Sequence, residues 1–457
     1  MDVRHGVPSS AESARGNHEV GVENLDNSEA AWIEEVHRNI EAASVWTPPW
    51  ANQERAGDES NTNPSILRVP TRFKEQNPEH YGPKVVAIGP YHRDNSELLI
   101  KDEAKWWCVN QFVSQYSLNL PNWLLHMTSR EREARSYYSE DVSMDRHSFL
   151  EMLLLDGCFI FMAFKAMRGF KFDLEWPSDQ IMLDLLMLEN QIPFFVLLQI
   201  YDGIGGEQGF RKFTGGSYGP IIAYALSWLD QTKMRNVQDP PNIPDPVLPL
   251  LHLFHLYLHP ARFNPDNIVR QKMLDHVFPT PTVVPSATGL HDRSAVNFKK
   301  VSGSILDITF RNGVMKIPFL ELNDGVKTIL HNLIAFEQCY RQIEPRVTTY
   351  AEFMNCLINK ESDADLLESC GILLNRLPTS NDAAFFFSKL SPRAKIRSIY
   401  LKSLTAKVKI YHEETWNRWR ADLKLNYFSN PWVTISVLAA TALLILTFMQ
   451  TYYSARS

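Results

Sequence analysis

The chain has 457 residues, of which 44% are apolar, which excludes a mostly disordered protein and provides for a sizeable core. Its formal net charge of −6 excludes the general affinity for nucleic acid that concentrated Lys and Arg provide. Five cysteines without a CxxC pair argue against a disulfide framework and suit a reducing compartment, so we interpret them as small core residues.

Residues 1–64 form a predicted acidic, largely disordered tail. They contain twelve acidic residues and four arginines, and their first thirty residues lack the apolar run of a signal peptide. Four apolar residues near the middle of the tail, Trp32, Ile33, Val36 and Ile40, share one face of a predicted short helix at 29–43. That helix either packs on the main domain or docks a partner. We favour packing, because short apolar stripes are usually packed.

The predicted globular domain covers residues 65–424 and is mainly α, of the α+β class. A short β-like run at 84–88 is stopped by Gly89-Pro90. Residues 145–167 are apolar nearly all round and predict a buried helix. Residues 181–200 have the same character, and Pro193 should kink or end their helix.

The second half of this domain begins with a Gly-rich and then Pro-rich stretch at 201–249. That composition predicts surface loops and makes the stretch the best candidate for an internal boundary. Ser304–Leu322 alternates around Asn312-Gly313, which predicts a small β-hairpin. Helical patterns resume at Lys327 and continue to the C-terminal segment.

Residues 425–457 are predicted to contain a membrane anchor and a short tail. No charged residue occurs from Leu425 to Ala455, and fourteen of the eighteen residues from Trp432 to Met449 are apolar. Eighteen helical residues rise about 27 Å, close to the ~30 Å hydrocarbon core of a bilayer. The alternative is a buried core helix, which is unusual for so long an uncharged stretch at a chain end.

The charges beside this segment predict its orientation. Lys and Arg are more numerous at 400–424 than after the span, where only Arg456 follows. The positive-inside rule therefore places the main domain in the cytosol. We expect a single-pass membrane protein, with the plasma membrane as its location.

Three acidic residues in apolar surroundings are candidates for acid or base chemistry: Asp156, Glu189 and Glu337. No spacing rule connects them, so hydrogen bonding that ties helices together is the favoured interpretation. His252, His255 and His259 would lie roughly on one helical face, but they lack the acidic or cysteine neighbours of a metal site. We therefore expect no catalytic, cofactor or metal site.

Five blocks occur in a fixed order along the domain: KVVAIGPYHR (84–93), EMLLLDGCFI (151–160), DLLMLENQIPFFVL (184–197), DITFRNGVMKIPFLEL (307–322) and NLIAFEQC (332–339). With the apolar C-terminal segment, they resemble the plant family called domain of unknown function 247, from about Ile66 to the end of the chain. The family motif falls here on Gly89, Pro90, Tyr91, His92, Asp156, Gly157, Glu189, Asn190, Gln191, Pro193, Glu337 and Gln338. Arg93 departs from the family pattern, in which a second His is common.

The resemblance implies a plant source, a membrane location and a largely helical domain, and it carries no catalytic residue onto this sequence. Some grass members are associated with self-incompatibility, and others with development or stress responses. We therefore expect a non-enzymatic recognition or signalling protein that binds another protein through loops such as 201–249. A self-incompatibility determinant is one special case. The alternative is a membrane-bound enzyme that uses Asp156, Glu189 or Glu337.

Overall fold

The computed structural model describes residues 65–166, 177–206, 221–236, 247–259, 284–340, 343–390, 401–414 and 431–456. All of them belong to one unit of the chain, which runs from Asn63 to Ser457 and is not divided at the Gly-rich and Pro-rich stretch. The expected internal boundary there is therefore wrong. The acidic tail and its predicted helix at 29–43 lie outside the described residues.

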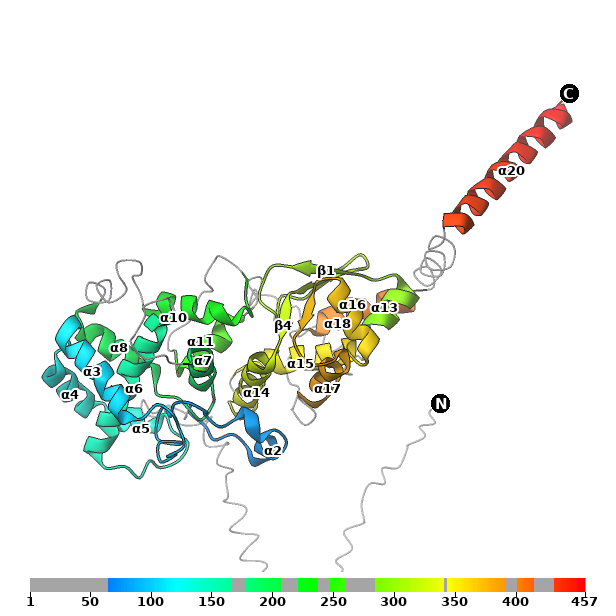
Figure 1. The fold of residues 1–457 in the computed structure, drawn as a ribbon. Coiled ribbons are helices and arrows are strands. Elements are labelled where there is room, and N and C mark those ends of the chain that lie inside the picture. The colour runs from blue at the N-terminus through cyan, green and yellow to red at the C-terminus, as the bar shows by residue number, and fades with distance from the viewer. Residues whose placement is uncertain are drawn as a thin grey trace, which may run out of the picture. The chain divides into compact units, whose positions relative to one another are not determined.

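Helices make up most of the described chain, and the strands form two small sheets, so the mainly α class is confirmed (Figure 1). The helices of the first part are α2 (Thr71–Lys74), η2 (Pro78–His80), α3 (Asp102–Tyr116), α4 (Leu120–Ser129), α5 (Glu131–Ser136), α6 (Arg146–Ala166), α7 (Ser178–Leu185), α8 (Phe194–Gly203), α10 (Ile221–Leu229), η3 (Asp230–Thr232) and α11 (Leu250–Tyr257). Those that follow are α13 (Ala287–Ser294), α14 (Asp324–Cys339), α15 (Arg346–Leu357), α16 (Glu361–Ser369), α17 (Ser380–Leu390), α18 (Lys402–Glu413) and α20 (Pro431–Arg456).

Helix α6 is the centre of the first group of helices and contacts α3, α4 and α8. Its sequence is apolar nearly all round, so a position with neighbours on every side is the one that buries most apolar surface. The stretch Arg146–Lys165 is long and apolar enough to cross a membrane, but 83% of it is buried inside the protein. The predicted buried helix at 145–167 is therefore confirmed.

The predicted helix from Ile181 ends earlier than expected, because the chain leaves the helix well before Pro193, the residue that was expected to kink or end it. Helix α7 ends at Leu185, and α8 begins directly after Pro193. Side-chain amides of the intervening segment bind the carbonyls that a continued helix would use. Asn190 donates to the Asp184 carbonyl at 2.9 Å, and Gln191 donates to the Leu185 carbonyl at 2.7 Å. These bonds cap α7 and make continuation unnecessary.

The stretch 201–249 is not made of surface loops throughout. Its described part contains helix α10, whose residues Tyr224, Trp228 and Leu229 are buried in the core. Helix α10 packs on α6 and α11, since its apolar residues recur at helical spacing. The remaining residues of the stretch, 207–220 and 237–246, lie outside the described residues.

Two small sheets occur in the second half of the described chain. The strands are β1 (Asn297–Val301), β2 (Thr309–Arg311), β3 (Val314–Pro318), β4 (Leu320–Leu322) and β5 (Leu373–Asn375). One sheet has the order β1-β3-β2, with β1 parallel and β2 antiparallel to β3, and the other pairs β4 with β5 in parallel. Asn312 and Gly313 have φ of 51° and 74°, as a two-residue hairpin turn requires, so the predicted β2–β3 hairpin is confirmed.

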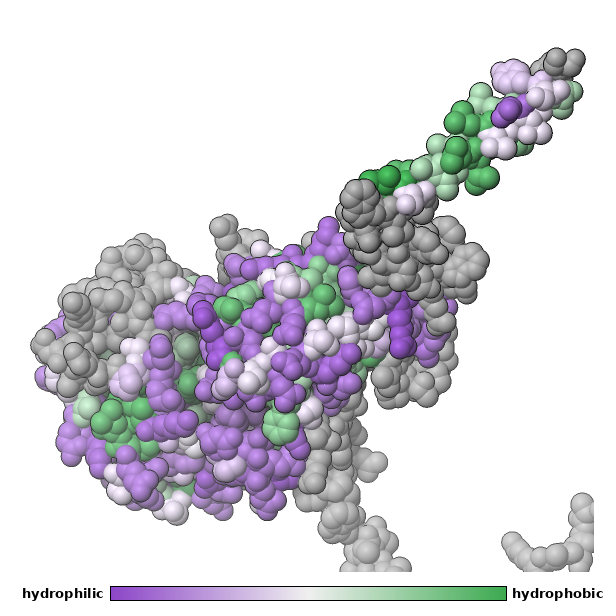
Figure 2. All heavy atoms as spheres, turned by 45° about the vertical axis from the view of Figure 1, so that its right-hand side comes forward, coloured by the Kyte–Doolittle hydropathy of each residue, from purple (hydrophilic) through white to green (hydrophobic). Residues whose placement is uncertain are grey.

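Helix α20 contains the predicted anchor, from Trp432 to Met449. The stretch Leu438–Ala455 is long and apolar enough to span a bilayer, and none of it is buried. Figure 2 shows green, apolar residues concentrated on this helix, whereas the other described residues in that view are mainly purple. By length and composition, α20 is a candidate membrane span.

Candidate functional site

The motif segment 84–92 is held by side chains from distant parts of the chain, and it is not a strand. The expected β-like run is reduced to one isolated bridge between Val86 and Ile100. Asp184 Oδ2 accepts hydrogen bonds from the backbone N–H groups of Val85 at 2.7 Å and Val86 at 3.0 Å. A carboxylate therefore takes the donors that a neighbouring strand would have paired.

Asn190 and Gln191 continue this pattern. Asn190 Oδ1 accepts from the Ile88 N–H at 2.7 Å, while its Nδ2 donates to the Val86 carbonyl at 3.0 Å. Gln191 Oε1 accepts from the Leu251 N–H at 3.1 Å, at the start of α11. Pro193, the motif residue two positions after Gln191, directly precedes α8. These polar side chains thus replace backbone pairing in the interior, where unpaired groups are costly.

Asp156 lies in the middle of α6 and forms a buried ion pair. Its Oδ1 is 2.5 Å from Lys105 Nζ, and its Oδ2 accepts from the Gly89 N–H at 2.7 Å. Lys105 also donates to the Ala87 carbonyl at 2.6 Å. The ion pair therefore fixes α3, α6 and the motif segment to one another, and it supports the structural interpretation of Asp156.

Two glycines of the motif are explained by close packing. Gly89 has a φ of 75°, and a Cβ there would collide with the Gln191 carbonyl oxygen. A Cβ at Gly157 would collide with the Ile200 side chain of α8. Glycine at these positions permits the close approach of the segments that the polar side chains join.

Glu337, near the end of α14, caps the N-terminus of α15. One carboxylate oxygen accepts from the Val347 N–H at 2.8 Å, and the other accepts from the Thr348 N–H at 2.8 Å. A negative charge at this end of a helix is favourable, and both donors have no partner within the helix. The same carboxylate is 2.8 Å from His255 Nε2, and Gln338 donates to Thr348 Oγ1 at 3.4 Å. These contacts also favour a structural role.

Of the three histidines of 252–259, His252 and His255 are buried within α11, and His259 lies half-buried just after it. His255 binds Glu337, whereas His252 Nδ1 accepts from the Leu248 N–H at 3.2 Å. Burial lowers the pKa of His252 to about 4 and, with nearby His255, that of His259 to about 2. Across the part of the chain that the structure describes, no three His, Cys, Asp or Glu side chains gather so as to hold a metal ion.

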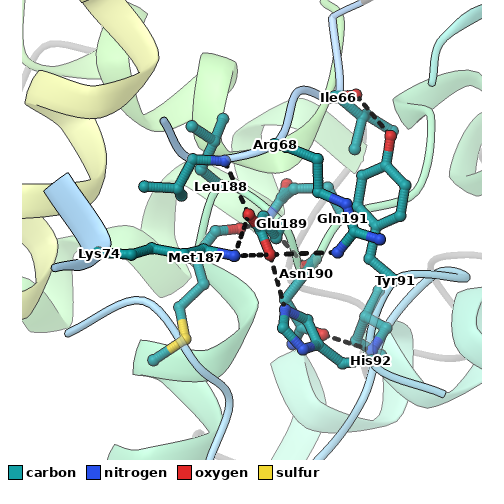
Figure 3. Close-up of polar contacts among 12 residues, drawn as sticks. Ile66, Arg68, Lys74, Tyr91, His92, Met187, Leu188, Glu189, Asn190 and Gln191 are labelled. Carbon is teal, nitrogen blue, oxygen red and sulfur yellow. Dashed lines mark hydrogen bonds and ion pairs between the residues drawn. The ribbon is translucent and has the colours of Figure 1, made fainter. Parts of the chain in front are cut away.

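Glu189 differs from the other acids because its partners extend to the surface. We call Arg68, Lys74, His92 and Glu189 the Glu189 cluster (Figure 3). The Glu189 side chain is fully buried, whereas those of Arg68, Lys74 and His92 are 38%, 39% and 19% exposed. The carboxylate is 2.7 Å from Lys74 Nζ, 3.3 Å from His92 Nε2 and 3.4 Å from Arg68 Nη1. It also accepts from the Val69 N–H at 2.7 Å.

This environment determines what Glu189 can do chemically. Burial alone would raise its pKa, but the nearby His92 imidazole, hydrogen bonds from Lys74 and the Val69 N–H, and the charge of Lys74 lower the pKa to about 2. A carboxylate with so low a pKa is a weak base near neutral pH and is not a proton donor. The charged contacts of the cluster therefore hold residues 66–74 and 89–92 against the segment that precedes α8.

The outer part of the Glu189 cluster continues to Tyr91. Arg68 Nε is 3.0 Å from Glu140 Oε2, and the Arg68 guanidinium lies 3.9 Å from the centre of the Tyr91 ring. The Tyr91 hydroxyl donates to the Ile66 carbonyl at 3.3 Å. Tyr91 and His92 of the GPYH motif thus bind the start of the domain, and Pro90 joins them to Gly89.

The structure brings most of the motif residues together around 84–92 and gives Glu337 a separate set of partners at α15. Sequence reasoning missed four participants: Arg68, Lys74, Lys105 and Asp184. Asp184 could have been found from the sequence, because it is an acidic residue in an apolar run, as Asp156 is. The basic residues carried no such signal, because their partners lie far away in the sequence. Met449 lies exposed on α20, in agreement with its assignment to the predicted anchor.

Comparison with known proteins gives the following matches. Residues 66–446 match a family described as a plant protein of unknown function, domain of unknown function 247. A UPF0481 protein of Arabidopsis thaliana is 28% identical over 430 residues, which cover 87% of this chain and 87% of that protein. A putative UPF0481 protein of the same plant is 23% identical over 511 residues, covering 93% and 94%. No solved structure matches the chain significantly.

Proposed function

The chain belongs to the plant family called domain of unknown function 247, and from that premise we propose that it is a membrane-anchored recognition protein, which binds another protein at the membrane. The observation that carries this proposal is the exposure of α20. The four consecutive side chains Leu443–Leu446 point to different sides of the helix, and each is between 57% and 71% exposed. A helix that is apolar all round is stable in a bilayer and unfavourable in water.

The buried acids support binding over catalysis. Asp156 and Glu337 are occupied by backbone N–H groups and by one cationic or imidazole partner each. Glu189 is held at a low pKa by its partners. We therefore assign no reaction to these residues and propose that the domain acts by binding and by localisation, since anchoring raises its effective concentration at the membrane.

The orientation and the membrane are part of the proposal. The excess of Lys and Arg at 400–424 over the single Arg456 supports a cytosolic main domain. We propose the plasma membrane as its location. A self-incompatibility determinant would be the special case in which the recognised partner differs between alleles, and pollen expression with extreme allelic variation would support it.

Proximity labelling in plant cells tests the anchored part of the proposal. The tag is placed at the N-terminus of three forms: the intact chain, a chain truncated after Leu425, and a chain in which 432–449 is replaced by an unrelated Leu/Ala span. We expect the intact and replaced forms to label the same membrane proteins, and the truncated form to lose them. If all three forms label the same soluble proteins, α20 is not an anchor. Protease digestion of sealed vesicles then reports on which side the tag lies.

The enzyme alternative predicts a different result. Glu189→Gln and Glu337→Gln keep the size of the side chains and remove their charges. On the binding proposal, these variants lower stability, and those that remain folded retain the labelled partners. Loss of a cellular phenotype with unchanged stability and unchanged partners would favour chemistry.

A further inference from the structure

The outer face of the three-stranded sheet is basic and carries no acid. Strands β1, β2 and β3 contain Lys299, Lys300, Arg311 and Lys316 and no Asp or Glu. Their buried residues, such as Phe298 and Met315, face the core, and the residues that alternate with them are exposed. Because successive side chains of a strand point to opposite faces, Lys299 and Lys316 lie on the solvent face. We call Lys299, Arg311 and Lys316 the basic sheet face.

Two charges of this face repel each other directly. Lys299 and Lys316 are register partners on adjacent strands, and Arg311 is paired with Val314 on the same side of β3. Like charges directly opposite one another destabilise a sheet. Within the described ranges, none of the three forms an ion pair with an acid. On strand β4, which follows β3 along the chain and belongs to the other sheet, Glu321 by contrast pairs with both Lys233 and Arg376. The positive charges of the basic sheet face thus have no acidic partner of the kind that Glu321 provides for Lys233 and Arg376.

The sheet is tied to the segment that leads into α20. Helix α18 packs on β2, and its Tyr411 ring lies 5.5 Å from that of Phe310. Tyr411 also covers Gly313 in the hairpin turn, where a Cβ would collide with its ring. Helix α18 ends at Glu413, the last described residue after it is Glu414, and α20 begins at Pro431. Even fully extended, the chain from Glu414 to Pro431 reaches at most about 60 Å.

From these observations we propose that the basic sheet face binds the anionic phospholipid headgroups of the membrane that holds α20. The proposal rests on the membrane anchoring proposed above. The cytosolic leaflet carries a negative surface potential, which attracts Lys and Arg within about one Debye length. The tether holds the sheet within about 60 Å of that surface and raises its effective concentration there, so a weak attraction is enough to orient the domain. Bound headgroups reduce the repulsion between Lys299 and Lys316, and they hold the domain in one orientation on the bilayer.

Amine footprinting of the full chain in lipid nanodiscs tests this proposal. Nanodiscs contain phosphatidylcholine alone or phosphatidylcholine with about 30% phosphatidylserine, to supply the negative surface potential. The rate of lysine acylation is read at each residue by mass spectrometry. Since one Lys near an anionic bilayer strengthens association roughly fivefold, we expect Lys299 and Lys316 to react about fivefold more slowly with phosphatidylserine present. The exposed Lys84 and Lys389, which lie outside the sheet, should not change.

Two further conditions sharpen the result. At about 0.5 M salt, where the Debye length is about 4 Å, the protection should disappear. In Lys299→Gln/Arg311→Gln, the remaining Lys316 should lose most of its phosphatidylserine-dependent protection, whereas in the matched variant Lys84→Gln/Lys389→Gln it should keep that protection. Equal reactivity of Lys299 and Lys316 in both nanodiscs, or protection that is independent of lipid charge, overturns the proposal while the anchor stands. A chain that does not enter either nanodisc contradicts the anchor and this inference together.

Discussion

Replacing Asp156 by Asn tests most directly whether the buried acids hold the fold together. Asp156 and Lys105 are both buried, and their charged atoms are 2.5 Å apart. The Asn side chain still offers an acceptor to the Gly89 N–H, but it leaves the Lys105 charge in the interior without a counterion. Because a buried charge cannot be solvated there, the folded state must lose stability.

The expected loss follows from the burial of the pair. Removing one partner of a buried ion pair costs about 3–5 kcal/mol, a large part of the roughly 5–15 kcal/mol by which folded proteins are stable. The second replacement Lys105→Met removes the stranded charge and keeps most of the apolar volume. Lys105→Met/Asp156→Asn should therefore recover about 1–3 kcal/mol relative to Asp156→Asn alone.

Urea unfolding of the full chain in detergent micelles measures these differences. The fluorescence of Trp123 and Trp228 reports on the core, because both side chains are buried. The control is Asp365→Asn at an exposed position, where the free energy of unfolding should stay within about 0.5 kcal/mol of the parent value. The reasoning is refuted if Asp156→Asn unfolds at the parent midpoint, or if the double variant is less stable than the single one.

Three further predictions concern other contacts. The pKa of Glu189 is lowered from 4.5 to about 2, so its contribution to stability is complete above pH 4.5 and is lost as the pH falls to about 2. It amounts to at most about 3 kcal/mol, and Glu189→Gln should flatten the pH dependence of the unfolding midpoint in that window; an unchanged slope contradicts the assignment. Glu337→Gln keeps a single accepting oxygen, so one of the two capped N–H groups of α15 loses its acceptor; the variant should cost about 1–3 kcal/mol in urea unfolding, whereas no change would rule out the capping role. Gly313→Ala places a Cβ against Tyr411 at a φ of 74° and should destabilise the protein by about 1–3 kcal/mol, whereas Gly82→Ala, with no atom near its Cβ, is the neutral control. Equal thermal midpoints for the two glycine variants would contradict the packing of α18 on the hairpin.

Local patterns in the sequence predicted the elements whose formation depends on neighbouring residues. The apolar run at 145–167 became α6, and Asn312-Gly313 became the hairpin turn, because helix burial and turn geometry depend on nearby side chains and on φ. The predicted β-like run at 84–88 did not form a strand. Its β-branched residues favour a strand, but its backbone N–H groups donate to Asp184 and Asn190 instead of to a neighbouring strand. The partners of Glu189 were equally invisible, because Arg68, Lys74 and His92 lie about a hundred residues earlier.

The sequence by itself determined the family, the mainly helical class and the presence of an uncharged apolar segment at the C-terminal end. The sequence also predicted a buried helix at 145–167 and a span at 432–449, but both helices pass the same test of length and composition, so the tertiary structure had to show which of them protein covers. Helix α6 is 83% buried and belongs to the core, whereas the corresponding stretch of α20 has no buried residues. Composition measures how much apolar surface must leave water, but only packing decides whether protein or lipid covers it.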